Sequence, residues 1–329
     1  MAYQLGRTVN LGIARETTRG TLESAAEFWE KHAELEIDDK FEASPIDTAF
    51  GQIEDADDSI ITKKWMEGSV RSHVKAQSIG LWLYSLLGGY AVAGVGGESV
   101  VYDHTLTVAQ TNIHQSLSIY TNDTIQDYKF ANCVVSDFEL ILEAGKFCDF
   151  KAKFVGKNGA TATNSVSFSA DDKLFIAKMA TVKQATDSSG LGAASAIPIH
   201  TLSFKINPNV ETEYILGSVS PNEFLNKQFQ VEAELELYYQ SEATFKTGAL
   251  ASTSGALQIT LANTDVTIGS TSNPTITITL YKFKAEELSR DLGVDGIVRQ
   301  KVKLKGMYSS SDTKMLQIVV RNLIATYAT

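Results

Sequence analysis

Residues 145–156 read GKFCDFKAKFVG, and residues 296–306 read GIVRQKVKLKG. Both stretches begin and end with glycine, and between the glycines apolar side chains largely alternate with charged or polar ones. A period of two predicts a β-strand with one buried face and one wet face. Two such strands, half a chain apart, predict two copies of one β-domain in a chain whose 329 residues fit two domains.

The order of elements before these strands also repeats. In each half two strand patterns and a short segment follow one another: residues 35–41, 69–74 and 78–88 in the first half, and residues 202–207, 230–237 and 241–250 in the second. The first short segment fits an apolar helix of about two turns, and the second is more polar. Residue identity between the halves is low, so the prediction depends on the order of elements. A duplicated domain allows a few chains to build a ring with more repeats than subunits.

The predicted organisation has four parts. They are an N-terminal arm at 1–33, a first β-domain at 34–185 with a long acidic loop at 43–62, a linker at 186–198, and a second β-domain at 199–329. Residues 22–32 and 171–184 fit either helix or strand. The uncharged stretch 77–97 is long enough to span a bilayer, but it contains six glycines and its apolar run ends at Leu87. We therefore interpret it as a short buried helix followed by a glycine-rich loop.

Composition excludes several classes of function. The net charge of −10 makes the chain a poor candidate for a protein that binds nucleic acid by neutralising phosphates, and no basic patch suits an anionic membrane. A hydrophobic content of 43% argues against disorder. The two cysteines, Cys133 and Cys148, are expected to be small buried residues of strands and not a disulfide.

Motifs for catalysis or metal binding are lacking. The sequence has no Gly-x-Ser-x-Gly, His-Glu-x-x-His, phosphate loop or Cys-x-x-Cys. Asp55, Asp57 and Asp58 are spaced like part of a calcium loop, but Ile60 stands where the turn glycine is required. His104 and His114 have no evident third ligand. We therefore expect no enzyme activity, no cofactor and no metal.

Two rows of like charge carry more information. Glu232, Glu234 and Glu236 alternate with apolar residues, and so do Lys301, Lys303 and Lys305. One reading is that the rows pair across strands or face water. The other is that one row lines a channel and the other meets a neighbouring subunit. Basic walls would hold phosphates, so in this second reading the glutamates face the lumen and the lysines form an interface.

Three segments give the chain a family resemblance. They are residues 5–21, residues 204–207 with 213–218, and residues 317–327. With them the chain resembles the tail tube (major tail) proteins of long, non-contractile-tailed bacteriophages. The resemblance implies β-sandwich or barrel-like domains, each with a short flanking helix, whose inner sheets join those of neighbours into a β-lined ring.

The resemblance also implies a function. Stacked rings would form a tail tube in the virion that conducts the genome from capsid to host cell, and a chain with two domains would form trimers of pseudo-sixfold symmetry. The implied partners are other copies of the chain, the tail terminator, the tape-measure protein and the tail-tip proteins. DNA would pass without sequence-specific binding, assembly would occur in the host bacterial cytoplasm, and no membrane is involved. The arm at 1–33 and the loop at 43–62, with Asp55, Asp57 and Asp58, are the expected contacts between rings.

Other classes of function remain open from the sequence. A carbohydrate-binding or adhesin-like β-sandwich would need clustered exposed aromatic residues, whereas Trp29, Trp65 and Trp82 are dispersed. An enzyme on a β scaffold would need a constellation that is not recognisable here. The tube of a phage-related secretion machine would share the same fold logic.

Overall fold

The computed structural model describes residues 5–49, 51–53, 55–241, 245–293 and 296–328. The chain is mainly β, as predicted, with a large antiparallel sheet that agrees with the β-sandwich class. The strands of the first half are β1 (Asn10–Arg15), β2 (Phe28–Glu30), β3 (His32–Pro45), β4 (Ser59–His73), β5 (Gly88–Gly94), β6 (Tyr102–Val108), β7 (Leu117–Asn122), β8 (Asp127–Glu143), β9 (Asp149–Gly156) and β10 (Ala160–Ala162). Those that follow are β11 (Ala180–Ala185), β12 (Ile199–Asn207), β13 (Glu211–Glu213), β14 (Glu223–Leu225), β15 (Gln230–Tyr238), β16 (Gly255–Ala262), β17 (Thr275–Asp291), β18 (Arg299–Gly306) and β19 (Leu316–Asn322). The helices are α1 (Ile79–Leu87) and α2 (Lys246–Leu250), with 3-10 turns at Gly6–Thr8, Ala177–Met179 and Ser188–Gly192.

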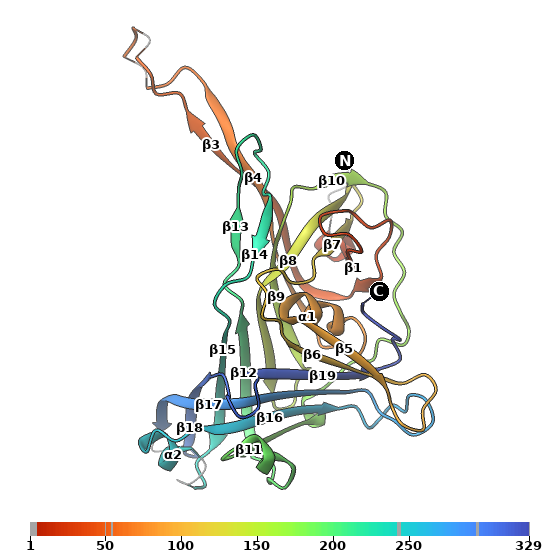
Figure 1. Ribbon diagram of the computed structural model, residues 1–329, viewed down its shortest axis with the longest axis vertical. Helices are drawn as coiled ribbons and strands as arrows, with labels where there is room; N and C mark the ends of the chain where they lie inside the picture. The colour runs from red at the N-terminus through yellow and green to blue at the C-terminus, as the bar shows by residue number, and fades with distance from the viewer. Residues whose placement is uncertain (1–4, 50, 54, 242–244, 294–295, 329) are drawn as a thin grey trace.

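Two long strands organise the fold. The first part of β8 pairs with β7 and β10, and its last part pairs with β9 and β12. In the same way the first part of β17 pairs with β16 and β19, and its last part pairs with β18. The β8–β12 pair joins the two halves into one sheet with the order β3-β4-β9-β8-β12-β15-β18-β17. In Figure 1 the strands β16 and β19 run across the direction of β12 and β15.

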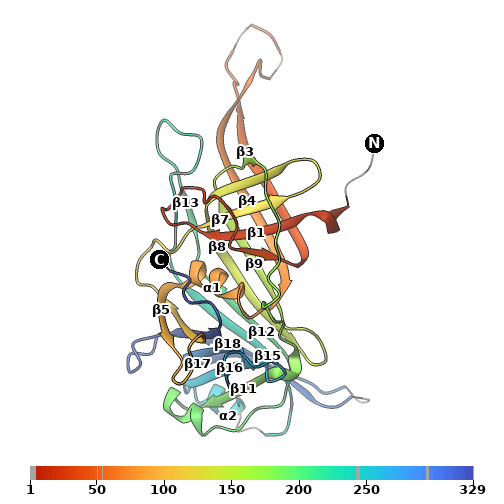
Figure 2. The same ribbon diagram turned by 90° about the vertical axis from the view of Figure 1, so that its right-hand side faces the viewer.

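Helix α1 lies against the core. Every residue of the helix except Tyr84 is buried, because the sequence is apolar all round. Gly80 allows the Tyr327 ring to lie directly against the helix, since a Cβ there would stand 2.3 Å from that ring. In Figure 2 the helix lies close to β5 and β8, two strands of the first half against which it packs. Most of the buried apolar residues form one cluster that includes Trp82, Phe150 and Phe204, so the main core is continuous across both halves, and Ala14, Trp29 and Tyr120 form a small second cluster.

The order of strand pairing is the same in the two halves. The first half pairs in the order β3-β4-β9-β8-β7-β1, and the second in the order β12-β15-β18-β17-β16-β11. Strand β10 lies on β8 as β19 lies on β17. The two stretches that open the sequence analysis become β9 and β18, which are 8 residues each and end at Gly156 and Gly306.

Three irregularities of the sheet recur at corresponding places. A β-bulge is one inserted residue that bends a strand and has a defined position in a fold. The register shifts lie between His32/Glu34 in β3 and Ile199/Thr201 in β12, between Val135/Asp137 in β8 and Ala285/Glu287 in β17, and between Leu117/Ile119 in β7 and Gly255/Leu257 in β16. When Gly156 is aligned with Gly306, the second pair of shifts falls opposite corresponding residues of β9 and β18.

The segment at 43–62, expected as a loop, is mostly part of a hairpin. Strands β3 and β4 pair as far as Pro45 and Ser59, so only residues 46–58 connect them. The hairpin projects from the body, and the shorter β13–β14 hairpin lies beside it (Figure 1). A hydrogen bond of 2.7 Å from the Lys64 amide to the Val219 carbonyl joins the two hairpins.

Several other expectations change in detail. The expected N-terminal arm contains β1, which pairs with β7, and residues 22–32 contain the strand β2. In the stretch 77–97 the buried helix is confirmed, but residues 88–94 form β5 where a glycine-rich loop was expected. Strand β11, at the end of the expected first domain, pairs with β16 of the second half.

Candidate assembly surfaces

The two charge rows lie side by side on one face of the sheet. Strand β15 pairs with β18, and the register places Glu232 opposite Lys305, Glu234 opposite Lys303 and Glu236 opposite Lys301. The sequence allowed the rows to pair across strands, and it also allowed them to lie on separate surfaces, with the glutamates in a lumen and the lysines at an interface. Directly paired residues of an antiparallel sheet point to the same face, so that separation does not hold.

The charges of the two rows compensate one another. Lys303 Nζ lies 3.3 Å from Glu232 Oε2, and Arg299 Nη1 lies 2.9 Å from Glu236 Oε1. The hydrogen bond to Glu232 raises the pKa of Lys303, and the bond to Glu236 raises the pKa of Arg299. A shallow groove of 460 Å³ runs over these residues between β12 and β17. This face of the sheet therefore carries positive and negative side chains side by side.

The charged face extends over both halves. The registers align one line of directly paired residues across the sheet, formed by Glu34, Arg71, Lys151, Glu139, Lys205, Glu232 and Lys305. Ion pairs along it join Arg71 to Glu34 at 3.0 Å and Lys205 to Glu139 at 3.8 Å. The opposite face of the same strands is buried in the core, so the charged side chains all lie on the other face of the sheet.

The two projecting hairpins carry exposed apolar residues at their ends. Phe41 is 66% exposed, Ile53 is 102% exposed and Leu216 is 103% exposed relative to the free residue. Asp55, Asp57 and Asp58 lie beside Ile53 in the connection at 46–58, and all three are exposed. Exposed apolar side chains rimmed by charges are typical of surfaces that contact another protein.

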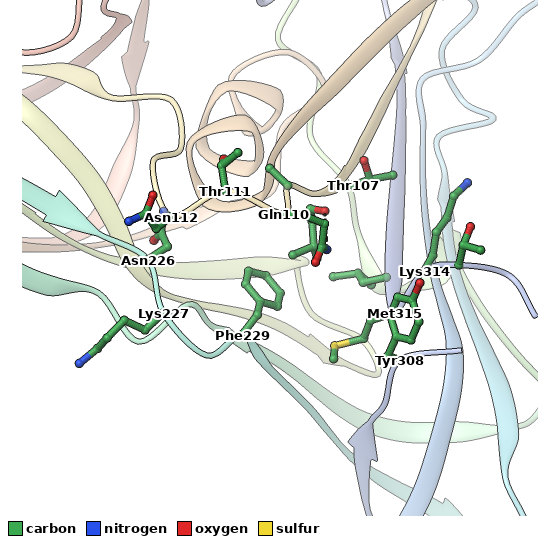
Figure 3. A pocket seen from close by; sticks show the side chains of 14 residues that line it. Thr107, Gln110, Thr111, Asn112, Asn226, Lys227, Phe229, Tyr308, Lys314 and Met315 are labelled. Carbon is green, nitrogen blue, oxygen red and sulfur yellow. Dashed lines mark hydrogen bonds between the residues drawn. The ribbon is translucent and has the colours of Figure 1, made fainter. Parts of the chain in front are cut away.

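A second groove, of 730 Å³, lies between the segment after β6, the β14–β15 connection and the β18–β19 connection (Figure 3). Amide and hydroxyl groups line it together with Phe229, Met315 and two lysines. Its 14 lining residues include no histidine, cysteine, aspartate or glutamate. The groove therefore lacks the groups that most often act as general acid or base.

The histidines have structural partners. His104 hydrogen-bonds Tyr90 at 2.8 Å and Asn322 at 3.0 Å, and His114 bonds the Leu86 carbonyl at 2.9 Å. Burial lowers the pKa of both. Within the described residues no three His, Cys, Asp or Glu side chains are grouped so that they could hold a metal.

Two further points concern the cysteines and the helices. Cys133 and Cys148 are buried and free, and burial raises the pKa of both thiols, that of Cys148 to about 12. Across the part of the chain that the structure describes, neither length nor apolarity would allow any helix to cross a bilayer.

Two strand edges were not foreseen from the sequence. Strand β3 pairs with β4 alone, and the last part of β17 pairs with β18 alone among the described residues. Open edges of this kind invite pairing with another chain. Sequence alternation identifies a strand but gives no sign of which edge stays open, because that depends on the neighbours of the strand in the sheet.

The fold is that of a mainly β protein with a large antiparallel sheet, and its exposed apolar and charged surfaces are of the kind that contacts other proteins. The family model described as phage tail tube protein matches residues 6–295, which is most of the chain. The chain belongs to this family, as its resemblance implied. No curated protein matches it. The family is one of structural components of the virion tail, and it implies self-association and contacts with other tail components.

Proposed function

We propose that this chain is the wall subunit of a phage tail tube, and that three chains form a ring of six similar β-units. The observation that carries the proposal is the repeated strand order with its three recurring bulges, in a chain of the tail tube family. In this proposal the first unit begins at β1 and the second at β11. The unit boundary therefore lies near residue 180, earlier than the linker expected at 186–198.

The charged face of the long sheet lines the bore. The support for this placement is that the other face is filled by α1 and the apolar core. Alternating charges give the wall no continuous basic strip, so DNA phosphates would find no fixed sites and the genome could pass without sequence-specific binding. Both the glutamate row and the lysine row belong to the bore in this proposal.

The two hairpins make the contacts between stacked rings. They project in the same direction from corresponding places of the two units, between β3 and β4 and between β12 and β15. Their exposed apolar ends, with Asp55, Asp57 and Asp58, would be covered by the next ring. The remaining partners, which are the terminator, tape-measure and tip proteins, would bind the two ends of the tube, with assembly in the host bacterial cytoplasm.

The experiment is electron microscopy of the concentrated protein with mass measurement of isolated rings. We expect rings or tubes with a central hole and a ring mass of three times 35.8 kDa. A ring of six chains would refute the two-unit arrangement while leaving the tube. Monomers without any ring in the concentrated protein would refute the tube itself.

A further inference from the structure

One junction between the two units is visible inside the chain. Strand β8 of the first unit pairs with β12 of the second, with Glu139 opposite Lys205 and Leu140 opposite Phe204. Ser203 Oγ donates a hydrogen bond of 2.6 Å to Glu139, and Lys205 approaches the same carboxylate. This junction shows how the first unit pairs with the second within one chain.

Two strand edges that correspond to the edges of this junction have no partner strand among the described residues. Strand β17 occupies the place in the second unit that β8 occupies in the first, and β3 occupies the place of β12. One edge of β8 pairs with β12, but among the described residues no strand pairs with the corresponding edge of β17. Likewise, one edge of β12 pairs with β8, but no described strand pairs with the corresponding edge of β3.

We propose that the last part of β17 in one copy pairs antiparallel with β3 of the next copy, in the register of the β8–β12 junction. The occupant is a second copy of this chain. The proposal rests on the ring described under Proposed function and adds to it the two edges and their alignment. A contact between two different edges is head-to-tail, so it repeats around a ring until the ring closes.

The recurring bulges fix the register. The bulge in β3 before Glu34 corresponds to that in β12 before Thr201, so Asp38 corresponds to Lys205. The bulge in β8 before Asp137 corresponds to that in β17 before Glu287, and counting on from it makes Ser289 correspond to Glu139.

The internal pair Lys205–Glu139 therefore becomes Asp38 opposite Ser289 between copies. The neighbouring pairs follow from antiparallel order. Ile37 lies opposite Arg290, and Leu35 lies opposite Leu292.

The side chains at these positions fit a junction. Leu292 is 64% exposed and Leu35 is half-buried in the single chain, and each would cover the other. The Ser289 hydroxyl would stand beside the Asp38 carboxylate, as Ser203 stands beside Glu139 inside the chain. One opposition is unfavourable, because Asp291 would face Glu36. Arg299 lies opposite Asp291 on β18 and offsets part of that repulsion.

Paired cysteines test the register. We expect disulfide-linked oligomers, up to the closed ring, from assembled Asp38→Cys/Ser289→Cys or from assembled Ile37→Cys/Arg290→Cys. Adjacent pairs in an antiparallel sheet alternate between close and wide spacing, so one of the two variants has the geometry for a disulfide. The native thiols are buried and their raised pKa keeps them from competing.

Two control variants frame the result. Glu139→Cys/Lys205→Cys carries the corresponding pair inside one chain, so its disulfide should leave the mass of the denatured protein unchanged. Glu34→Cys/Ser289→Cys is displaced by four residues on the same face, about 13 Å along the strand, and should not link. Linking of this displaced pair in place of the proposed pairs would overturn the register.

A measurement on the unaltered protein tests the junction even if the cysteine variants fail to assemble. Hydrogen exchange at residues 34–39 and 286–291 should slow at least tenfold when rings form, because open-edge amides become bonded. Rings with a central hole in which both segments still exchange as in the dilute subunit would overturn this junction and leave the tube in place. Absence of rings from the unaltered protein would instead refute the proposed function.

Discussion

Glu30 on β2 is a fully buried carboxylate that ties three segments together. Lys75, only 6% exposed, forms an ion pair with Glu30 Oε2, and the Trp82 indole donates to Glu30 Oε1 at 3.3 Å. Strand β2, the segment between β4 and α1, and helix α1 therefore meet at one ion pair in the core. Burying a charge is tolerable only while its partner remains.

Lys75→Met is expected to lower the free energy of unfolding by about 3–5 kcal/mol, because it leaves Glu30 buried without its counter-charge. Urea unfolding of the dilute subunit measures the change. Lys40→Met is the matched control, since its pair with Asp38 is exposed and should contribute less than about 1 kcal/mol. Equal effects of the two substitutions would contradict the role of burial.

Glu98 joins the β5–β6 turn of the first half to the turn before β17. Its carboxylate accepts hydrogen bonds from the amides of Ser270 and Thr271 at 2.6 and 2.8 Å, and these lower its pKa from 4.5 to about 2. A lowered pKa means that the contact is complete above about pH 4.5 and is lost as the pH falls towards 2.

We therefore expect the amides of Ser270 and Thr271 to lose protection from hydrogen exchange, relative to the intrinsic rate at each pH, between about pH 4.5 and pH 2. In Glu98→Gln the same amides should be less protected at neutral pH, and their protection should not change over this acid range. Unchanged protection in the native protein down to pH 2 would show that another group holds this turn.

At the scale of elements, the closing glycines of β9 and β18 are required by packing. A Cβ on Gly156 would lie 3.0 Å from Met66, and one on Gly306 would lie 3.0 Å from Val231. Met66 on β4 lies opposite Gly156, and Val231 on β15 lies next to the residue opposite Lys305, so the same close approach of strands recurs in both halves of the chain. Neither glycine is required by a left-handed backbone, since neither has a positive φ.

Gly306→Ala should lower the free energy of unfolding by about 1–3 kcal/mol, because the added methyl meets Leu280 at 2.9 Å and the Val231 backbone in a packed sheet. Thermal or urea unfolding measures it. Gly94→Ala, also in a strand but with no atom within 4 Å of the new methyl, is the control. A cost for Gly94→Ala that matches that of Gly306→Ala would point to backbone effects in place of packing.

At the scale of the whole molecule, the projecting hairpins are separable from the body. The connection at 46–58 lies beyond the last paired residues of β3 and β4, and below it β4 pairs with both β3 and β9 of the sheet. Its exposed apolar residues are costly to leave in water unless another molecule covers them.

Replacing residues 46–58 by a two-residue Asn-Gly turn should leave a folded subunit that forms rings but does not stack them into tubes. Electron microscopy with circular dichroism of the same sample distinguishes the outcomes. A triple variant, Asp55→Asn/Asp57→Asn/Asp58→Asn, separates the contribution of charge from that of the apolar end. Tubes of ordinary length from the shortened chain would show that this hairpin does not make the contact between stacked rings.

Much of the fold follows from local pattern. Alternation over 145–156 and 296–306 determined two strands and their buried faces, and the apolar run at 79–87 determined a buried helix. The repeated order of elements indicated two related units, because each element depends on its own residues and on short turns. Local pattern was misleading where glycine was taken for loop in 88–94, and at the two ends of 43–62, because residues 43–45 and 59–62 pair with one another as strands while 46–58 connect them.

Tertiary structure alone decided which strands are neighbours. A period of two tells which side chains share a face of one strand, but it does not tell which other strand pairs with it. For this reason the glutamate and lysine rows could be recognised but not brought together, although Glu234 lies directly opposite Lys303. Strand β8 pairs with β12, whereas β3 and the last part of β17 each have an edge that pairs with none of the strands described. The long-range path of the chain brings those edges together or apart, and no residue pattern within a strand records that path.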